Sequence, residues 1–226
     1  MVLPELVVCD FAGTVMRDDG AVLNAYRAAL TEHRIDFTEA ELASRRGANK
    51  RAVFHELAGR GRSPDEGAAL GDRALAIFES ALRREFEHGD VQEIFGATDA
   101  LRTLKGAHIK LALTSGFDRS LVDLLVGRLG LGDLFDLVLS GSDAPMGRPA
   151  PFFIYRAMME LRVIDVAWVA VVGDTVLDLQ AGSHAHAGWV IGVTSGAHSA
   201  EMLGMTHHTH LLPSVASLPG LFGLAQ

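Results

Sequence analysis

Two short apolar runs that each lead into an acidic residue constrain this chain more than any other feature. The run Leu6–Cys9 is followed by Asp10, and the run Val169–Val172 is followed by Gly173 and Asp174. Short apolar runs bounded by turn residues are typical of the buried strands of a parallel sheet. Because parallel strands end at the same edge of a sheet, we expect the two aspartates to lie close together.

The same pattern of strand and helix recurs along most of the chain. Apolar runs predict five strands, at 5–10, 109–115, 136–141, 168–173 and 189–194. Apolar residues at helical spacing predict helices between them, among them 97–106, 117–129, 151–161 and 176–186. Alternating strands and helices form a parallel sheet that is covered on both faces. The predicted fold class is therefore α/β, with a Rossmann-like, doubly wound parallel sheet.

A long helical stretch interrupts this alternation directly after the first strand. Residues 18–90 contain no strand-like run, and the last helix of this stretch repeats apolar residues at the spacing of one buried face. These residues are Leu70, Ala74, Ile77, Phe78, Ala81, Leu82 and Phe86. We therefore expect an all-helical cap at 18–90, inserted into an α/β core made of 1–17 and 91–226. Caps of this kind exclude water from reactive intermediates.

The composition of the chain indicates which kinds of molecule it can bind. The chain has 226 residues, of which 49% are hydrophobic, and a net charge of −8, so it offers no basic stripe for a nucleic acid. No run of about 18 apolar residues predicts a membrane span. The single cysteine, Cys9, excludes an internal disulfide, and with no signal sequence evident the cytoplasm is the expected location. We expect a small-molecule substrate and no nucleic-acid or membrane partner, and a homodimer is compatible with the sequence.

The two aspartates at the strand ends carry the predicted chemistry. Asp10 can serve both as a magnesium ligand and as a nucleophile, because a carboxylate attacks a phosphoryl group once a cation neutralises that group. The alternative for each aspartate is a helix cap or a solvated turn residue. The pairing of Asp10 with Asp174 after two strands favours phosphoryl transfer.

Three motifs follow in order along the chain, each after a predicted strand. They are Asp-x-Ala-Gly-Thr at 10–14, Gly-Arg-Pro-x-Pro at 147–151 and Gly-Asp-Thr-x-x-Asp at 173–178. In these motifs the chain resembles the haloacid dehalogenase superfamily, and within it the phosphonatase branch, which comprises phosphonoacetaldehyde hydrolase and its close relatives. The resemblance covers nearly the whole chain.

The resemblance implies a magnesium site and an aspartyl-phosphate intermediate. Asp10 would attack phosphorus, while its second oxygen, the main-chain carbonyl of Ala12 and the carboxylate of Asp174 would hold Mg²⁺. Asp178 lies one helical turn beyond Asp174 and would complete or orient the metal ligands.

Polar residues after the second and third strands are expected to bind the phosphoryl group. Thr114, Ser115 and Gly116 end the second strand and open a helix, where hydroxyl and backbone N–H groups can bind phosphoryl oxygens. Spacing leaves open which of the two hydroxyls does so, and either could be only an N-cap. Arg148 would supply a fixed cation for the phosphoryl charge and for Asp10. A surface arginine is the alternative.

The residue two positions after the nucleophile is Ala12, which cannot protonate a leaving group as the second acid of ordinary phosphatases does. The resemblance to phosphonatases implies that a cap lysine condenses with the substrate aldehyde, so that the leaving group departs as an enamine. The candidate is Lys50, at a helix N-terminus that Asn49 would cap. The helix dipole and the nearby Arg46 and Arg51 would favour its neutral amine. The alternative is a solvated surface lysine.

Three positions differ from phosphonoacetaldehyde hydrolases. Val53 stands where those enzymes have a histidine that assists Schiff-base chemistry, Arg46 replaces a methionine and Phe117 replaces a tyrosine. Three functions are therefore compared. The leading one is a Mg²⁺-dependent phosphonatase that cleaves the C–P bond of phosphonoacetaldehyde or a related oxo-phosphonate. The others are a phosphatase for a small phosphate ester and a non-catalytic module that binds phosphorylated metabolites.

Other histidine and glycine clusters are interpreted structurally. His207, His208 and His210 resemble metal ligands, but an exposed strand edge is the favoured interpretation. The segment 192–196 is interpreted as a turn after the fifth strand.

Overall fold

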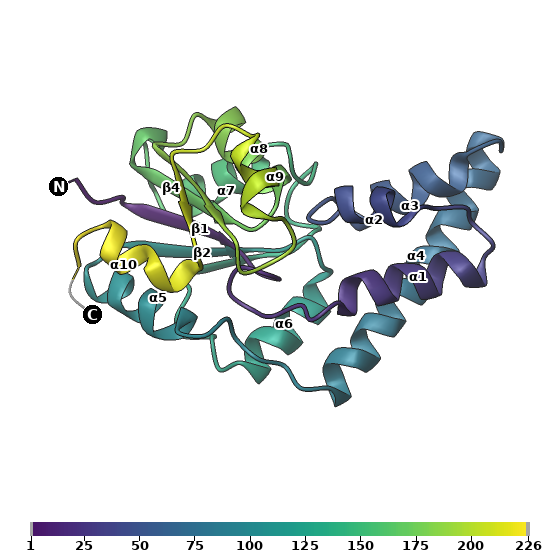
Figure 1. The fold of residues 1–226 in the computed structure, drawn as a ribbon, viewed down its shortest axis with the longest axis horizontal. Coiled ribbons are helices and arrows are strands. Elements are labelled where there is room, and N and C mark those ends of the chain that lie inside the picture. Colours follow the sequence, from purple (N-terminus) through teal and green to yellow (C-terminus); the bar gives the residue numbers. More distant parts are fainter. Residues whose placement is uncertain (1, 225–226) are drawn as a thin grey trace. The chain divides into compact units, whose positions relative to one another are not determined.

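The computed structural model describes residues 2–224, which form two compact units (Figure 1). One unit, here called the sheet unit, comprises residues 2–17 and 91–224. The other, here called the helical unit, comprises residues 18–90. Each unit is described by itself below.

The sheet unit is built on a six-stranded sheet in which all neighbouring strands are parallel, in the order β3-β2-β1-β4-β5-β6. The strands are β1 (Leu6–Asp10), β2 (Lys110–Thr114), β3 (Leu137–Leu139), β4 (Val169–Gly173), β5 (Trp189–Val193) and β6 (His210–Leu212). Strand order reverses beside β1, which lies between β2 and β4. Open α/β sheets bind ligands at the carboxyl ends of the strands where the order reverses. The α/β fold class predicted from the sequence is confirmed.

Helices cover both faces of this sheet, which explains why β1 and β4 are buried along their whole length. They are α5 (Ala97–Gly106), α6 (Arg119–Arg128), α7 (Phe152–Glu160), α8 (Val176–Ala185), α9 (Ala200–Gly204) and α10 (Leu218–Leu221), with 3₁₀ turns η1 (Val166–Trp168) and η2 (Val215–Ser217). Leu6 and Val8 of β1 pack in one cluster with residues of α7 and α8. Figure 1 shows α5 and α10 on the opposite face of the sheet.

The helical unit contains α1 (Ala21–Glu32), α2 (Glu39–Ser44), α3 (Lys50–Gly59) and α4 (Pro64–His88). On α4 the predicted apolar face is buried at Ala74, Phe78, Leu82 and Phe86 and partly buried at the other three positions. Phe78 packs against Tyr26 and Phe54, with ring centroids 4.7 and 5.4 Å away. This aromatic cluster joins α1, α3 and α4.

Two predicted features need correction, and one is extended. The helix expected at 117–129 begins at Arg119, because the side chain of Asp118 caps it by accepting a hydrogen bond from Leu121 N–H. Gly192 lies inside β5 and not in a turn, since the strand continues to Val193. The sixth strand, β6, was anticipated only as an exposed edge, and it does lie at the sheet edge. Among residues 2–224, no helix combines the length and the apolar character needed to cross a membrane.

Candidate active site

Three buried carboxylates meet at the carboxyl edge of the sheet. Asp10 is the last residue of β1, Asp174 follows β4, and Asp178 lies in the first turn of α8. Each carboxylate offers one oxygen, and these oxygens all lie within 4.8 Å of one another. The sheet register explains this proximity, because β1 and β4 pair in parallel from Leu6 and Val169 onward. Oxygen ligands of this kind suit a hard divalent cation.

Arg148 lies among these carboxylates with a side chain that is only 6% exposed. Its Nη2 atom lies 2.7 Å from Asp10 Oδ1, and its Nε atom lies 2.8 Å from Asp178 Oδ1. Burial acts to lower the pKa of Arg148, but the charges of Asp10, Asp178 and Asp174 outweigh it and hold the pKa above its usual value. The interpretation of Arg148 as a surface arginine is therefore wrong.

The buried charges of the site sum to a negative value, which would favour the binding of a cation. Burial raises the pKa of Asp10 well above its usual value; Arg148 opposes this shift, while Asp178 and Asp174 add to it. Three carboxylates and one guanidinium carry charges of −3 and +1, which leaves −2 when all are ionised. A divalent cation would neutralise this charge and stabilise the ionised form of Asp10.

One carboxylate oxygen supports the fit of a cation directly. Asp178 Oδ1 is buried and, within the described residues, accepts no hydrogen bond, although it forms an ion pair with Arg148 Nε at 2.8 Å. The other oxygen, Oδ2, accepts hydrogen bonds from Thr175 N–H at 3.0 Å and Thr175 Oγ1 at 2.5 Å. A buried acceptor with an unused lone pair is costly unless a ligand uses it.

Glycines allow the backbone to approach these carboxylates. Gly13 has φ of +95°, and a Cβ at this position would lie 2.3 Å from Asp174 Oδ2. A Cβ at Gly173 would lie 2.3 Å from the Cβ of Asp178. Any larger residue at either position would displace a carboxylate, which explains the two motif glycines physically.

The hydroxyls of Thr114 and Ser115 have different partners. Thr114 Oγ1 accepts a hydrogen bond from Arg148 Nη2 at 2.7 Å and donates one to the Cys9 carbonyl at 3.2 Å. Its single proton is therefore committed to the backbone. Ser115 Oγ accepts from Phe117 N–H at 3.1 Å, a bond that leaves its proton for another acceptor. The N-cap of the following helix is Asp118, so neither hydroxyl has the capping role considered above.

Gly116 lies in the loop that joins β2 to α6, next to Gly141 of the loop after β3. A Cβ on Gly141 would lie 2.9 Å from the Gly116 carbonyl oxygen. Gly141 N–H also donates to the Phe117 carbonyl at 2.7 Å. These contacts fix the path of the loop that follows Thr114 and Ser115. Ala12 is partly buried and bridges to Met16 in the loop after β1.

Lys50 belongs to the helical unit, where it is the first residue of α3 and only 8% exposed. As expected, Asn49 is the N-cap, with a side chain that accepts from Ala52 N–H at 3.0 Å. The Nζ atom of Lys50 donates to the Ala48 carbonyl at 3.2 Å and lies 5.6 Å from the centre of the Tyr26 ring. The alternative of a solvated surface lysine is therefore wrong.

The arginines beside Lys50 are both paired with carboxylates of the same unit. Arg46 forms an ion pair with the buried Asp18, and Arg51 lies 3.1 Å from Asp72. Their charges are thus partly neutralised, which weakens the repulsion that the sequence suggested they exert on Lys50.

No histidine of α3 is placed to assist this lysine. Val53 is 3% exposed and belongs to the apolar core of the helical unit. His55, two residues further on, directs Nε2 to Asp72 Oδ1 at 2.8 Å. The difference from phosphonoacetaldehyde hydrolases noted in the sequence is therefore not offset by a neighbouring side chain of this helix.

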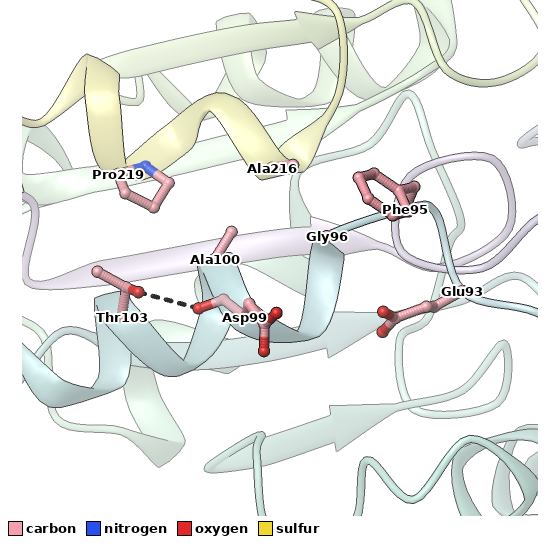
Figure 2. A pocket seen from close by; sticks show the side chains of 8 residues that line it. All are labelled: Glu93, Phe95, Gly96, Asp99, Ala100, Thr103, Ala216 and Pro219. Carbon is pink, nitrogen blue, oxygen red and sulfur yellow. Dashed lines mark hydrogen bonds between the residues drawn. The ribbon is translucent and has the colours of Figure 1, made fainter. Parts of the chain in front are cut away.

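Other features of the sheet unit lie apart from the carboxylates. His207 and His208 precede the edge strand β6, which begins at His210. Within residues 2–224, Asp10, Asp174 and Asp178 form the group of acidic side chains whose oxygens lie close enough together to hold a metal ion. A pocket of about 570 Å³ lies elsewhere in the sheet unit, and Figure 2 shows the side chains that line it. It is lined by Glu93, Phe95, Gly96, Asp99, Ala100, Thr103, Ala216 and Pro219, and by none of the site residues above.

Several residues that shape the site were not found from the sequence. Thr14 Oγ1 donates to Asp174 Oδ1 at 3.2 Å, and the Thr175-x-x-Asp178 spacing is a capping box that could have been recognised. The loop after β5 also contacts Asp174: Ala197 N–H donates to its Oδ2 at 2.6 Å. No local sequence pattern indicates this last contact.

Comparison with known proteins agrees with this geometry. A family model described as haloacid dehalogenase-like hydrolase matches residues 4–186. Phosphonoacetaldehyde hydrolase of Bacteroides fragilis (strain ATCC 25285) is 34% identical over 120 residues, which are 53% of this chain and only 44% of that relative. Phosphonoacetaldehyde hydrolase of Bacillus cereus (strain G9842) is 29% identical over 213 residues, covering 89% of this chain and 79% of the relative. A hydrolase from Pseudomonas syringae has the same fold, with a TM-score of 0.85 at 18% identity over 98% of this chain and 100% of the other.

Proposed function

Because this chain belongs to the haloacid dehalogenase-like hydrolase family, we propose that it is a Mg²⁺-dependent phosphonatase-like hydrolase that cleaves the C–P bond of phosphonoacetaldehyde or a related oxo-phosphonate. The observation that carries the proposal is the buried set of Asp10, Asp174, Asp178 and Arg148, combined with Ala12 where ordinary phosphatases have an acid. This set provides a nucleophile, cation ligands and a fixed positive charge. It lacks a general acid for an alcohol leaving group.

Asp10 is the proposed nucleophile. Its carboxylate attacks phosphorus, the C–P bond breaks, and the phosphoryl group becomes bound to Asp10. Water then attacks phosphorus and releases phosphate and the free carboxylate. The ion pair with Arg148 holds Oδ1 of Asp10, and the same guanidinium would neutralise phosphoryl charge.

The carboxylates of Asp10 and Asp174 and the main-chain carbonyl of Ala12 would hold Mg²⁺, with Asp178 completing or orienting this set. The cation would supply charge neutralisation for the attack of one anion on another. Support comes from the buried Oδ1 of Asp178, which accepts no hydrogen bond within the described residues, and from the excess negative charge of the site.

Ser115 and Gly116 are the proposed phosphoryl-binding residues of the loop after β2, together with Arg148. Ser115 Oγ–H has no acceptor among the described residues and can donate to a phosphoryl oxygen, whereas Thr114 Oγ–H donates its hydrogen bond to the Cys9 carbonyl. Thr114 is therefore assigned to holding Arg148 in place.

Lys50 is the proposed Schiff-base residue. A neutral amine would condense with the substrate aldehyde and release water, and the resulting iminium would accept the electron pair of the breaking C–P bond. The leaving group then departs as an enamine and needs no acid at position 12. The burial of Lys50 on α3 supports a role other than solubility.

A phosphate ester is the second candidate substrate. The observation that favours it is the absence of a histidine beside Lys50, since Val53 is part of the core and His55 is paired with Asp72. In that case the substrate itself or a water molecule would protonate the leaving alcohol, in place of the acid that is missing at position 12. A non-catalytic binding module is disfavoured, because it would have no need for a buried nucleophile, an arginine and two further carboxylates.

Phosphate release from two substrates tests the proposal. Purified protein is given phosphonoacetaldehyde or p-nitrophenyl phosphate, each with Mg²⁺ and with excess chelator. Release from phosphonoacetaldehyde that needs Mg²⁺ and exceeds release from the ester supports the phosphonatase. Release from the ester alone supports the second candidate, and no release from either substrate supports the binding module.

A further inference from the structure

A four-residue loop after β5, Ser195–His198, contacts both of the loops that carry the proposed cation ligands. Ser195 Oγ donates to the Gly13 carbonyl at 2.8 Å, in the loop after β1. Ala197 N–H donates to Asp174 Oδ2 at 2.6 Å, and His198 N–H donates to the Asp174 carbonyl at 3.2 Å. The loop therefore ties the segment after β1 to the segment after β4.

The fit between this loop and Asp174 is tight. A Cβ added to Gly196 would lie 2.1 Å from Asp174 Oδ2. The carboxylate thus rests directly on the backbone of the loop, and a small shift of the loop would move a proposed ligand.

The side chain of His198 adds a contact to Val176, two residues beyond Asp174. It is 4% exposed, and its Nδ1 accepts a hydrogen bond from Val176 N–H at 3.0 Å. A backbone N–H can only donate, so Nδ1 must be the unprotonated nitrogen of the ring. Val176 is the first residue of α8, and its N–H is one of those that a helix leaves without an internal partner.

We propose that His198 is a positioning residue of the cation site, which fixes the start of α8 and thereby the direction of Asp174 and Asp178. The proposal rests on the proposed function only in taking these carboxylates as cation ligands. Asp174 lies two residues before Val176 and Asp178 two residues after it. If the start of α8 were not held by His198, the positions of both carboxylates would become less fixed. Partners that orient metal ligands typically change cation affinity by about 10- to 100-fold when removed.

The test is a calorimetric titration of the whole protein with MgCl₂, without substrate. His198→Leu removes the acceptor and is expected to weaken Mg²⁺ binding about tenfold. His198→Asn keeps an acceptor oxygen close to the place of Nδ1, so it should restore most of the affinity. His207→Leu, at an exposed histidine of the same unit, is the matched control and should bind Mg²⁺ as the wild type does.

Circular dichroism of each variant establishes that it is folded. If His198→Leu does not fold, His198→Ala carries the test, because it removes the same acceptor with a smaller side chain and should likewise weaken Mg²⁺ binding. Equal affinity of the wild type and the folded loop variants would overturn the inference alone. Equal loss in His198→Leu and His198→Asn would also overturn it. A wild type that binds no Mg²⁺ would overturn both this inference and the proposed cation site.

Discussion

Arg148 Nη2 lies 2.7 Å from Asp10 Oδ1, inside a site where both side chains are less than a tenth exposed. The same nitrogen donates to Thr114 Oγ1 at 2.7 Å, and the Nε atom lies 2.8 Å from Asp178. One guanidinium thus connects the ends of β1, β2 and the start of α8. The consequences of this arrangement can be measured residue by residue.

Asp10→Asn should abolish turnover and leave the fold intact. The amide cannot attack phosphorus, so the rate should fall by about three orders of magnitude or more. The substitution also removes one of three mutually repelling buried carboxylates, so the thermal unfolding midpoint should not fall. Steady-state phosphate release and a thermal scan give both results. More than a tenth of wild-type activity in this variant would exclude covalent catalysis by Asp10.

Mg²⁺ should stabilise the wild type and have little effect on Asp174→Asn. A ligand that binds only the folded state at about 100 times its dissociation constant adds about 2.7 kcal/mol to the free energy of unfolding. Urea denaturation with and without Mg²⁺ measures this difference. The Asp174→Asn variant is the control, and equal stabilisation of both proteins would place the cation elsewhere.

Ser115→Ala and Thr114→Val should differ in what they change: the first mainly phosphoryl binding, the second mainly the stability of the fold. Ser115→Ala should lower kcat/KM by about 10- to 100-fold, because it removes one donor to the phosphoryl group. It also removes the acceptor of Phe117 N–H, so its stability should fall, but by less than that of Thr114→Val, which loses two buried hydrogen bonds. Thr114→Val removes the hydroxyl that donates to the Cys9 carbonyl and accepts from Arg148, two buried hydrogen bonds, so it should cost about 1–3 kcal/mol of stability. Kinetics and urea denaturation of both variants test the assignment, which the reverse pattern would contradict.

The thiol of Cys9 should resist alkylation in the folded protein. Burial raises the pKa of this thiol, and the charge of Asp10 raises it further, so the reactive thiolate is suppressed at pH 8. Iodoacetamide should modify Cys9 only in urea, as mass spectrometry of the whole protein will show. Rapid modification without denaturant would mean that the strand next to Asp10 opens readily.

The architecture of the sheet unit could be predicted from the sequence, because its strands are short apolar runs that end at clear turn residues. Parallel strands end at one edge, so the proximity of Asp10 and Asp174 could be predicted from two local patterns. The burial of Lys50 could not, because it depends on the Tyr26 ring, which lies 24 positions earlier in the chain. The role of the loop at His198 was also hidden, since its partners Asp174 and Val176 lie more than 20 positions away and no local motif links them.

The most direct test of C–P bond cleavage is borohydride trapping at Lys50. If Lys50 forms an iminium with phosphonoacetaldehyde, borohydride added during turnover reduces the C=N bond and leaves a stable adduct on this lysine. Lys50→Arg keeps the positive charge but cannot condense with the aldehyde, so it should form no adduct and release no phosphate from this substrate. Peptide mass spectrometry should find the adduct on Lys50 in wild-type protein, together with loss of activity. Absence of any adduct, with phosphate released only from p-nitrophenyl phosphate and by wild type and Lys50→Arg alike, would contradict the phosphonatase mechanism and leave the ester hydrolase.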